Sequence, residues 1–171
     1  MTCASGRQSD VGSPTIRRVR PDEYDTVGEL TVRVYREGGF GSPGYEPALR
    51  DAAGRDASAQ VLVADLDGRV VGAVTIATRG GEWAERSGPG EAEIRMLVVD
   101  PDVRGAGTGE ALVRACIDRA HEDGCTVLRL STEPEMTTAH RLYERLGFVR
   151  TPSYDWEPVP GVRLLGYELV L

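Results

Sequence analysis

The sequence predicts a single α/β domain, built on a mixed β-sheet with helices on both of its faces. Three observations lead to this prediction. Short apolar runs typical of strands alternate with helical patterns along the chain. The dipeptide Asp67-Gly68 separates two such runs, as in the tight turn of an antiparallel hairpin. The strand–helix–strand unit over residues 91–130 requires a parallel pair joined by a right-handed crossover.

Seven strands are predicted, from alternating or continuous apolar residues. They span residues 15–20, 59–65, 69–78, 91–99, 126–130, 148–150 and 162–170. Four helices are predicted between them: one from residue 21 to Gly38-Gly39, a short one over 47–53, and two over 105–123 and 134–146. A proline and two acids suit the first turn of the first helix, and Gly124 and Gly147 suit the ends of the last two.

Length and composition limit the class of protein. The 171 residues suit one domain, expected over 14–171, after a polar, Gly- and Ser-rich tail over 1–13 that we expect to be disordered and not a signal peptide. The net charge of −7 argues against binding to nucleic acid or to an anionic membrane, and it is compatible with a cationic amine. No apolar run is long enough for a membrane span. The three cysteines form no Cys-x-x-Cys motif, which favours a reduced, metal-free, cytoplasmic protein; a homodimer is left open.

A glycine-rich stretch follows the strand expected over 91–99. Residues 104–109 (RGAGTG) lead directly into the long helix. Glycines let the backbone approach a ligand closely, and the first N–H groups of a helix point outward without partners. A strand, a glycine-rich turn and a helix start together suit a pyrophosphate, although many such turns only join a strand to a helix.

A second segment, residues 139–148 (AHRLYERLGF), lies about thirty residues further on. Together the two segments resemble motifs A and B of the GCN5-related N-acetyltransferase (GNAT) superfamily, in the family's order and at its usual distance. The resemblance is specific over residues 91–148 and looser over 15–171. It implies the family's fold, in which two parallel central strands splay apart and leave a V-shaped cleft for the pantetheine arm of acetyl-CoA.

The resemblance implies that acetyl-CoA is the cosubstrate. The residues expected to hold its pyrophosphate, mainly through backbone N–H groups at the helix start, are Arg104, Gly105, Ala106, Gly107, Thr108 and Gly109. Arg104 would either order the turn or reach a phosphate oxygen. The backbone of Leu97, Val98 and Val99 would pair with the pantetheine amides like an added strand, and one N–H would polarise the thioester carbonyl.

Two residues are candidates for proton transfer. Glu93 matches in spacing the strand glutamate that acts as base in the histone acetyltransferase branch, and a buried carboxylate could take the proton of an amine. The alternative is a solvated strand glutamate, like Glu91 on the same face. Tyr143 matches the family's tyrosine near the thioester sulfur and could protonate the leaving thiolate. The alternative is a core tyrosine on the apolar stripe of its helix.

Several other residues carry weaker expectations. Met136 stands where motif B usually has an asparagine that contacts the cofactor, so that contact is either missing or taken over by Thr137 or Thr138. Trp83 and Tyr45 either border the acceptor entrance or only pack. His121 and His140 have no metal-ligand partners at suitable spacing and are expected on exposed helix surfaces.

The resemblance therefore implies an acyltransferase that passes an acetyl group from acetyl-CoA to a primary amine, of a small molecule or a protein, by direct attack in a ternary complex. Two alternatives remain. One is a non-catalytic acyl-CoA-binding or sensor module of the same fold, and the other is an interaction protein whose glycine-rich motif is only a packing turn. The loops over residues 40–54 and 79–90 would set the acceptor, which the sequence does not identify.

Overall fold

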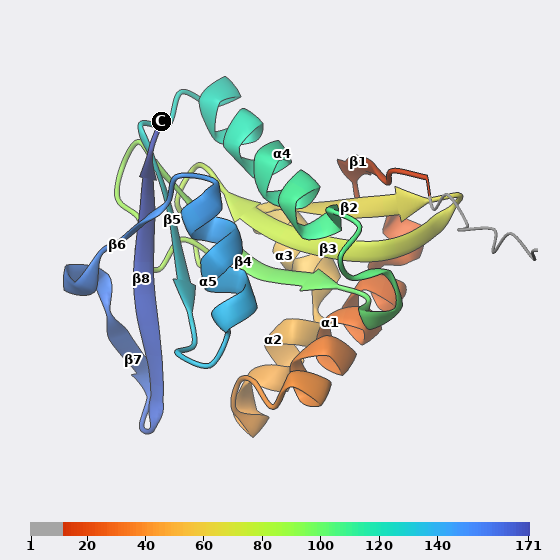
Figure 1. Cartoon of the computed structure of the whole chain (residues 1–171), viewed down its shortest axis with the longest axis horizontal. Coiled ribbons are helices and arrows are strands. Elements are labelled where there is room, and N and C mark those ends of the chain that lie inside the picture. Colours follow the sequence, from red (N-terminus) through yellow and green to blue (C-terminus); the bar gives the residue numbers. More distant parts are fainter. Residues whose placement is uncertain (1–11) are drawn as a thin grey trace, which may run out of the picture.

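A mixed β-sheet forms the centre of the computed structural model, which describes residues 12–171 (Figure 1). Its strands are β1 (Thr15–Arg18), β2 (Gln60–Leu66), β3 (Arg69–Ala77), β4 (Glu91–Val99), β5 (Val127–Thr132), β6 (Val149–Arg150), β7 (Trp156–Val159) and β8 (Val162–Val170). The order across the sheet is β1-β2-β3-β4-β5-β8-β6, and β7 pairs with β8. Within residues 12–171, only β4 and β5 run parallel, as predicted from the crossover unit. Residues 1–11 of the expected tail lie outside the described residues.

The strand β7 was not predicted. Its sequence, Trp-Glu-Pro-Val, shows no alternation of apolar and polar residues, and its pairing with β8 is interrupted between Trp156 and Val159. The proline is tolerated there because β7 is an edge strand, in which a missing N–H breaks no central ladder.

The helices are α1 (Tyr24–Gly38), α2 (Glu46–Arg50), α3 (Ala52–Ser58), α4 (Thr108–Glu122) and α5 (Thr137–Arg145). The single short helix expected over 47–53 is wrong. The chain forms two helices divided at Asp51, whose carboxylate accepts the N–H of Gly54 at 2.8 Å and so caps α3. Helix α4 begins three residues later than expected, because Gly105 and Gly107 have φ angles of 83° and 78°.

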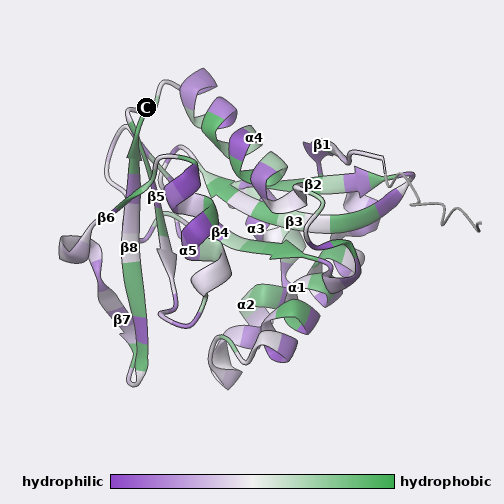
Figure 2. Ribbon diagram, viewed as in Figure 1, coloured by the Kyte–Doolittle hydropathy of each residue, from purple (hydrophilic) through white to green (hydrophobic). Residues whose placement is uncertain are grey.

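Helices α1 to α3 cover one face of the sheet, and α4 and α5 cover the other (Figure 1). The alternation of side chains along β2 shows why. Val61 and Val63 pack with α1, whereas Leu62 and Ala64 face α4. The strands are accordingly apolar along much of their length (Figure 2). Within residues 12–171, no helix is both long and apolar enough to cross a bilayer.

The parallel pair β4–β5 opens partway along its length. Pairing covers Glu91–Ile94 with Val127–Leu130 and then stops, after which β5 continues only beside β8. The register of β4 against β3 shifts at the same point, where Met96 has a φ of 54°. A bulge with a non-glycine residue in the left-handed region bends the strand. The splayed arrangement implied by the resemblance is thus present.

Candidate active site

The glycine-rich turn presents its backbone to solvent at the start of α4. Gly107 is the residue before the helix, and a Cβ built on Gly105 or Gly107 would meet no atom within 4 Å. The carbonyl of Gly107 accepts the N–H of Ala111 at 2.9 Å, and no side chain of residues 12–171 caps the start of the helix. The first N–H groups of a fifteen-residue helix therefore remain available for an anion.

Gly109 joins three segments that are separate in the sequence. A Cβ at this position would lie 3.4 Å from a methyl of Leu142 on α5 and 3.6 Å from a methyl of Val99 on β4. The turn, the end of β4 and the helix of motif B therefore lie side by side at Gly109.

The end of β4 has one backbone edge that pairs with no strand of the described part of the chain. Asp100 donates its N–H to the carbonyl of Val71 at 2.8 Å, so the alternation of backbone groups turns the N–H of Val99 away from β3 and toward the gap beside β5. The side chain of Val98 is buried in the core, and those of Leu97 and Val99 are partly buried. This edge could pair with an extended ligand such as a pantetheine arm.

Tyr143 lies in the core, with its side chain against two other aromatic rings. The ring centroids of Phe148 and Tyr167 are 5.7 and 6.3 Å away, and Tyr143 is 6% exposed. Burial raises the pKa of its hydroxyl above the usual value, so the group keeps its proton at neutral pH. The hydroxyl makes no hydrogen bond with another described residue. Tyr143 therefore packs in the core as a neutral phenol, and its role as a proton donor stays a prediction.

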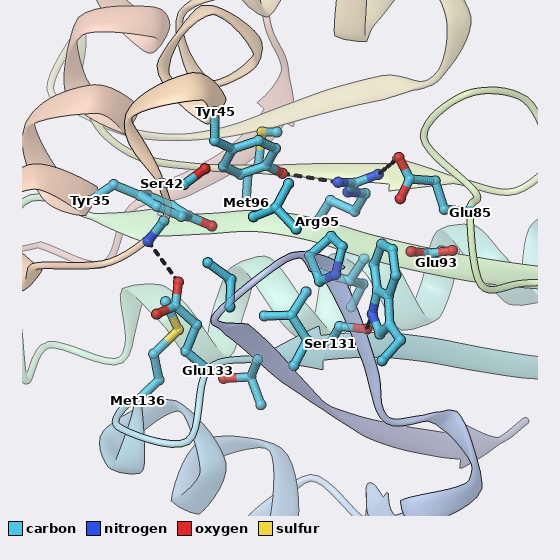
Figure 3. Close-up of a pocket in the computed structure, with 18 residues that line it drawn as sticks. Tyr35, Ser42, Tyr45, Glu85, Glu93, Arg95, Met96, Ser131, Glu133 and Met136 are labelled. Atoms are coloured by element: carbon cyan, nitrogen blue, oxygen red, sulfur yellow. Dashed lines mark hydrogen bonds and ion pairs between the residues drawn. The ribbon is translucent and has the colours of Figure 1, made fainter.

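A cavity of about 300 Å³ lies between β4 and the β7–β8 hairpin, closed at one side by the segment after α1 (Figure 3). Glu93 lines it and is only 2% exposed, so the solvated alternative is wrong. Its Oε2 accepts the backbone N–H groups of Arg86 at 2.8 Å and Ser87 at 3.2 Å, while Oε1 accepts none from the described residues. Burial raises the pKa of this carboxyl, against the opposing effect of the two N–H donors.

Glu91, two residues earlier, has a different environment. It forms an ion pair with Arg129 at 2.8 Å, and this pairing lowers the pKa of Glu91. Of the two strand glutamates, only Glu93 therefore combines burial, a raised pKa and access to the cavity.

Arg95 is a cavity residue that the sequence analysis missed. Its guanidinium donates to the Tyr45 hydroxyl at 2.9 Å, lies 3.3 Å from Glu85, and stacks over the ring of Trp83 at 5.4 Å. Tyr45 thus lines the cavity, one of the two alternatives for it, while Trp83 packs against Arg95. The available indication in the sequence was a charged residue between Ile94 and Met96, inside the strand expected over 91–99.

Glu133, in the turn between β5 and α5, was also missed. Its Oε1 accepts the N–H of Gly41 at 2.6 Å (Figure 3). Met136, at the motif's asparagine position, lines the same cavity. His121 is exposed as expected, but the expectation for His140 is wrong. That histidine is half-buried, with Nε2 3.0 Å from the carbonyl of Glu133 and its ring against Tyr167.

Comparisons with known proteins agree with this geometry. Residues 24–148 match the model of the Acetyltransferase (GNAT) family. Mycothiol acetyltransferase of Cellulomonas flavigena is 37% identical over 92 residues, which cover 53% of this chain and 26% of that protein. An uncharacterized N-acetyltransferase of Methanocaldococcus jannaschii is 33% identical over 141 residues, covering 78% of this chain and 60% of that protein. The chain thus spans less than two thirds of either relative.

A solved structure shows the same fold. The structure of yncA from Salmonella typhimurium with its cofactor acetyl-CoA superimposes with a TM-score of 0.68, at 22% identity, over 94% of this chain and 95% of that one. The family model covers most of the chain, including the glycine-rich turn and the helix of Tyr143. The chain therefore belongs to the GNAT family of acetyltransferases, which use acetyl-CoA.

Proposed function

We propose that the chain transfers an acetyl group from acetyl-CoA to a primary amine by direct attack in a ternary complex. The observation that carries this proposal is the buried carboxylate of Glu93, which faces the cavity beside the point where β4 and β5 separate. An alkyl amine has a reference pKa near 10.4 and is charged at neutral pH. A charged amine cannot attack, so a base in the cavity must first take its proton.

In this proposal Glu93 acts as the base and Tyr143 as the acid. The ammonium loses one proton before attack and a second as the C–N bond forms, and Glu93 passes these protons on, directly or through water. The C–S bond breaks as the tetrahedral carbon collapses to the amide. Tyr143 gives its proton to the departing sulfur and regains one from the site. One proton is released overall, and the products are the N-acetyl amine and the CoA thiol.

Two segments of the chain would form the binding site for acetyl-CoA. The open backbone of Arg104 to Gly109 would hold the pyrophosphate, and the free edge of β4 over Leu97–Val99 would pair with the pantetheine arm. The supporting observation is that the side chains of Val99 and Leu142 both lie beside Gly109, so the glycine-rich turn adjoins the end of β4. The chemistry would then take place where this groove meets the cavity of Glu93.

The test is release of the CoA thiol from acetyl-CoA in the presence of a panel of primary amines, with binding followed separately by the melting temperature. A ligand that binds only the native state raises that temperature. We expect acetyl-CoA to stabilise the protein and at least one amine to release thiol above the rate of hydrolysis. Stabilisation without release by any amine would favour the non-catalytic acyl-CoA-binding module instead.

A further inference from the structure

We infer that the acceptor carries a second cationic group besides the amine that is acetylated, as in a short diamine or polyamine, and that Glu133 and Thr132 bind this second group. The inference rests on the proposed function and names the acceptor class for that same cavity.

The charges of the cavity are not balanced by the protein. The charged side chains that line it are Glu85, Glu93, Arg95 and Glu133. Glu85 and Arg95 form an ion pair at 3.3 Å and offset one another. Within residues 12–171, neither Glu93 nor Glu133 forms an ion pair with a cation. The negative charges of Glu93 and Glu133 therefore remain without a cation, and a single reacting amine can neutralise only one of them.

The end of the cavity at Glu133 has oxygen atoms that can accept hydrogen bonds from an ammonium group. Glu133 uses Oε1 to accept the N–H of Gly41, and its Oε2 accepts nothing from the described residues. The neighbouring Thr132 lines the cavity, is 3% exposed, and has a buried Oγ1 without a partner among those residues. Buried hydroxyls are normally hydrogen-bonded. An ammonium has three N–H donors and could serve both oxygens.

The two carboxylates are separated in space. Figure 3 shows Glu93 and Glu133 at opposite ends of the cavity. Glu93 extends from β4, and Glu133 extends from the β5–α5 turn. Apolar side chains line the same space, among them Met96, Met136 and Leu164. A methylene chain with an ammonium group at each end would suit such a cavity, with one end at Glu93 and the other at Glu133.

A simpler explanation is that Glu133 only fastens the segment after α1 to the β5–α5 turn, through Gly41. Glu133→Gln separates the two roles, because the amide oxygen still accepts the N–H of Gly41 while the negative charge is lost. Glu135→Gln is the matched control: it removes one charge from the same turn, at an exposed side chain that does not line the cavity. Thr132→Val removes the hydroxyl at nearly constant volume.

The experiment compares kcat/KM for 1,4-diaminobutane, n-butylamine and aspartate by CoA-thiol release. We expect the wild type to prefer the diamine over n-butylamine by about tenfold or more, the usual effect of one charge-assisted hydrogen bond. Glu133→Gln should reduce that ratio to near one, and Thr132→Val should reduce it in part. Glu135→Gln should keep the wild-type ratio, and all variants should melt with the wild type.

Three results would overturn the inference. A wild type that shows no preference for the diamine, or that prefers aspartate, does not bind a second cation. A loss in Glu133→Gln that is equal for both amines and accompanied by a lower melting temperature makes Glu133 a structural link. Absence of thiol release with any amine contradicts the proposed function itself, and so is distinguishable from the first two results.

Discussion

At the scale of single residues, the burial of Glu93 gives the mechanism its clearest test. Because burial raises its pKa, the carboxyl is protonated up to a higher pH than an exposed glutamate. Wild-type kcat/KM should therefore fall as the pH drops through that raised pKa. Glu93→Gln keeps an oxygen for the N–H groups of Arg86 and Ser87, removes this acidic limb, and lowers kcat/KM near neutral pH by roughly a hundredfold or more.

The loss in Glu93→Gln should shrink as the pH approaches the pKa of the amine, where neutral amine forms without a base. The measurement is a pH–rate profile of both proteins with one amine. A loss that is constant at every pH would assign Glu93 to positioning of the substrate, and an unchanged profile would leave it without a role in the reaction. Melting temperatures of the two proteins serve as the control for folding.

The role of the Tyr143 hydroxyl can be tested against that of Tyr167, whose ring lies next to it. Tyr143→Phe keeps the ring in the core and removes the hydroxyl group, and with it the proton that the raised pKa keeps on the oxygen. We expect kcat to fall by roughly tenfold to a thousandfold, with a normal melting curve. Tyr167→Phe removes a hydroxyl that contacts Glu144 at 3.3 Å and should leave kcat within about twofold. Equal kcat values in the two variants would make Tyr143 a packing residue alone.

At the scale of an element, both ends of α4 carry a glycine with positive φ, Gly107 before it and Gly124 after it. Both have open space around them, so an added side chain meets the same backbone strain at each. Only Gly107 lies where the pyrophosphate would bind. Gly107→Asp combined with Gly109→Asp should abolish acetyl-CoA binding in calorimetry, while Gly124→Asp should bind like the wild type. Unchanged binding in the double variant would rule out this turn as the phosphate site.

At the scale of the whole molecule, Arg17 fastens the N-terminal strand to the sheet. Its guanidinium lies 2.7 Å from both Glu23 and Asp65, and this contact lowers the pKa of Glu23 to about 2. A depressed carboxyl pKa contributes stability above the unfolded-state value, and that contribution is lost as the pH falls through the folded-state value.

Glu23→Gln should therefore lower the free energy of unfolding by about 1.5–3 kcal/mol at pH 7, the usual range for a hydrogen bond to a charged group. The difference from the wild type should shrink between about pH 4 and pH 2. Urea unfolding at several pH values measures it, with the exposed Asp22→Asn as the control. A difference that does not change with pH would show that the ion pair is not its source.

Local patterns in the sequence determined much of this protein. The turn Asp67-Gly68, the parallel pair around α4 and the glycine-rich motif follow from residue spacing and from the φ angles that glycine permits. The family follows as well, because its two motifs are short and continuous. These features depend on residues that are near one another in the chain, and so they can be predicted without knowledge of distant contacts.

Only the tertiary structure decided what surrounds the candidate base. The loop over residues 79–90 folds back over β4 and brings the N–H groups of Arg86 and Ser87 to Glu93. The guanidinium of Arg86 also packs on the ring of Trp156 on β7, 5.5 Å from the ring centroid. The placement of Glu133 against Gly41 likewise joins residues 92 positions apart. Burial, pKa and cavity charge are sums over such long-range contacts, and no local pattern of the sequence encodes them.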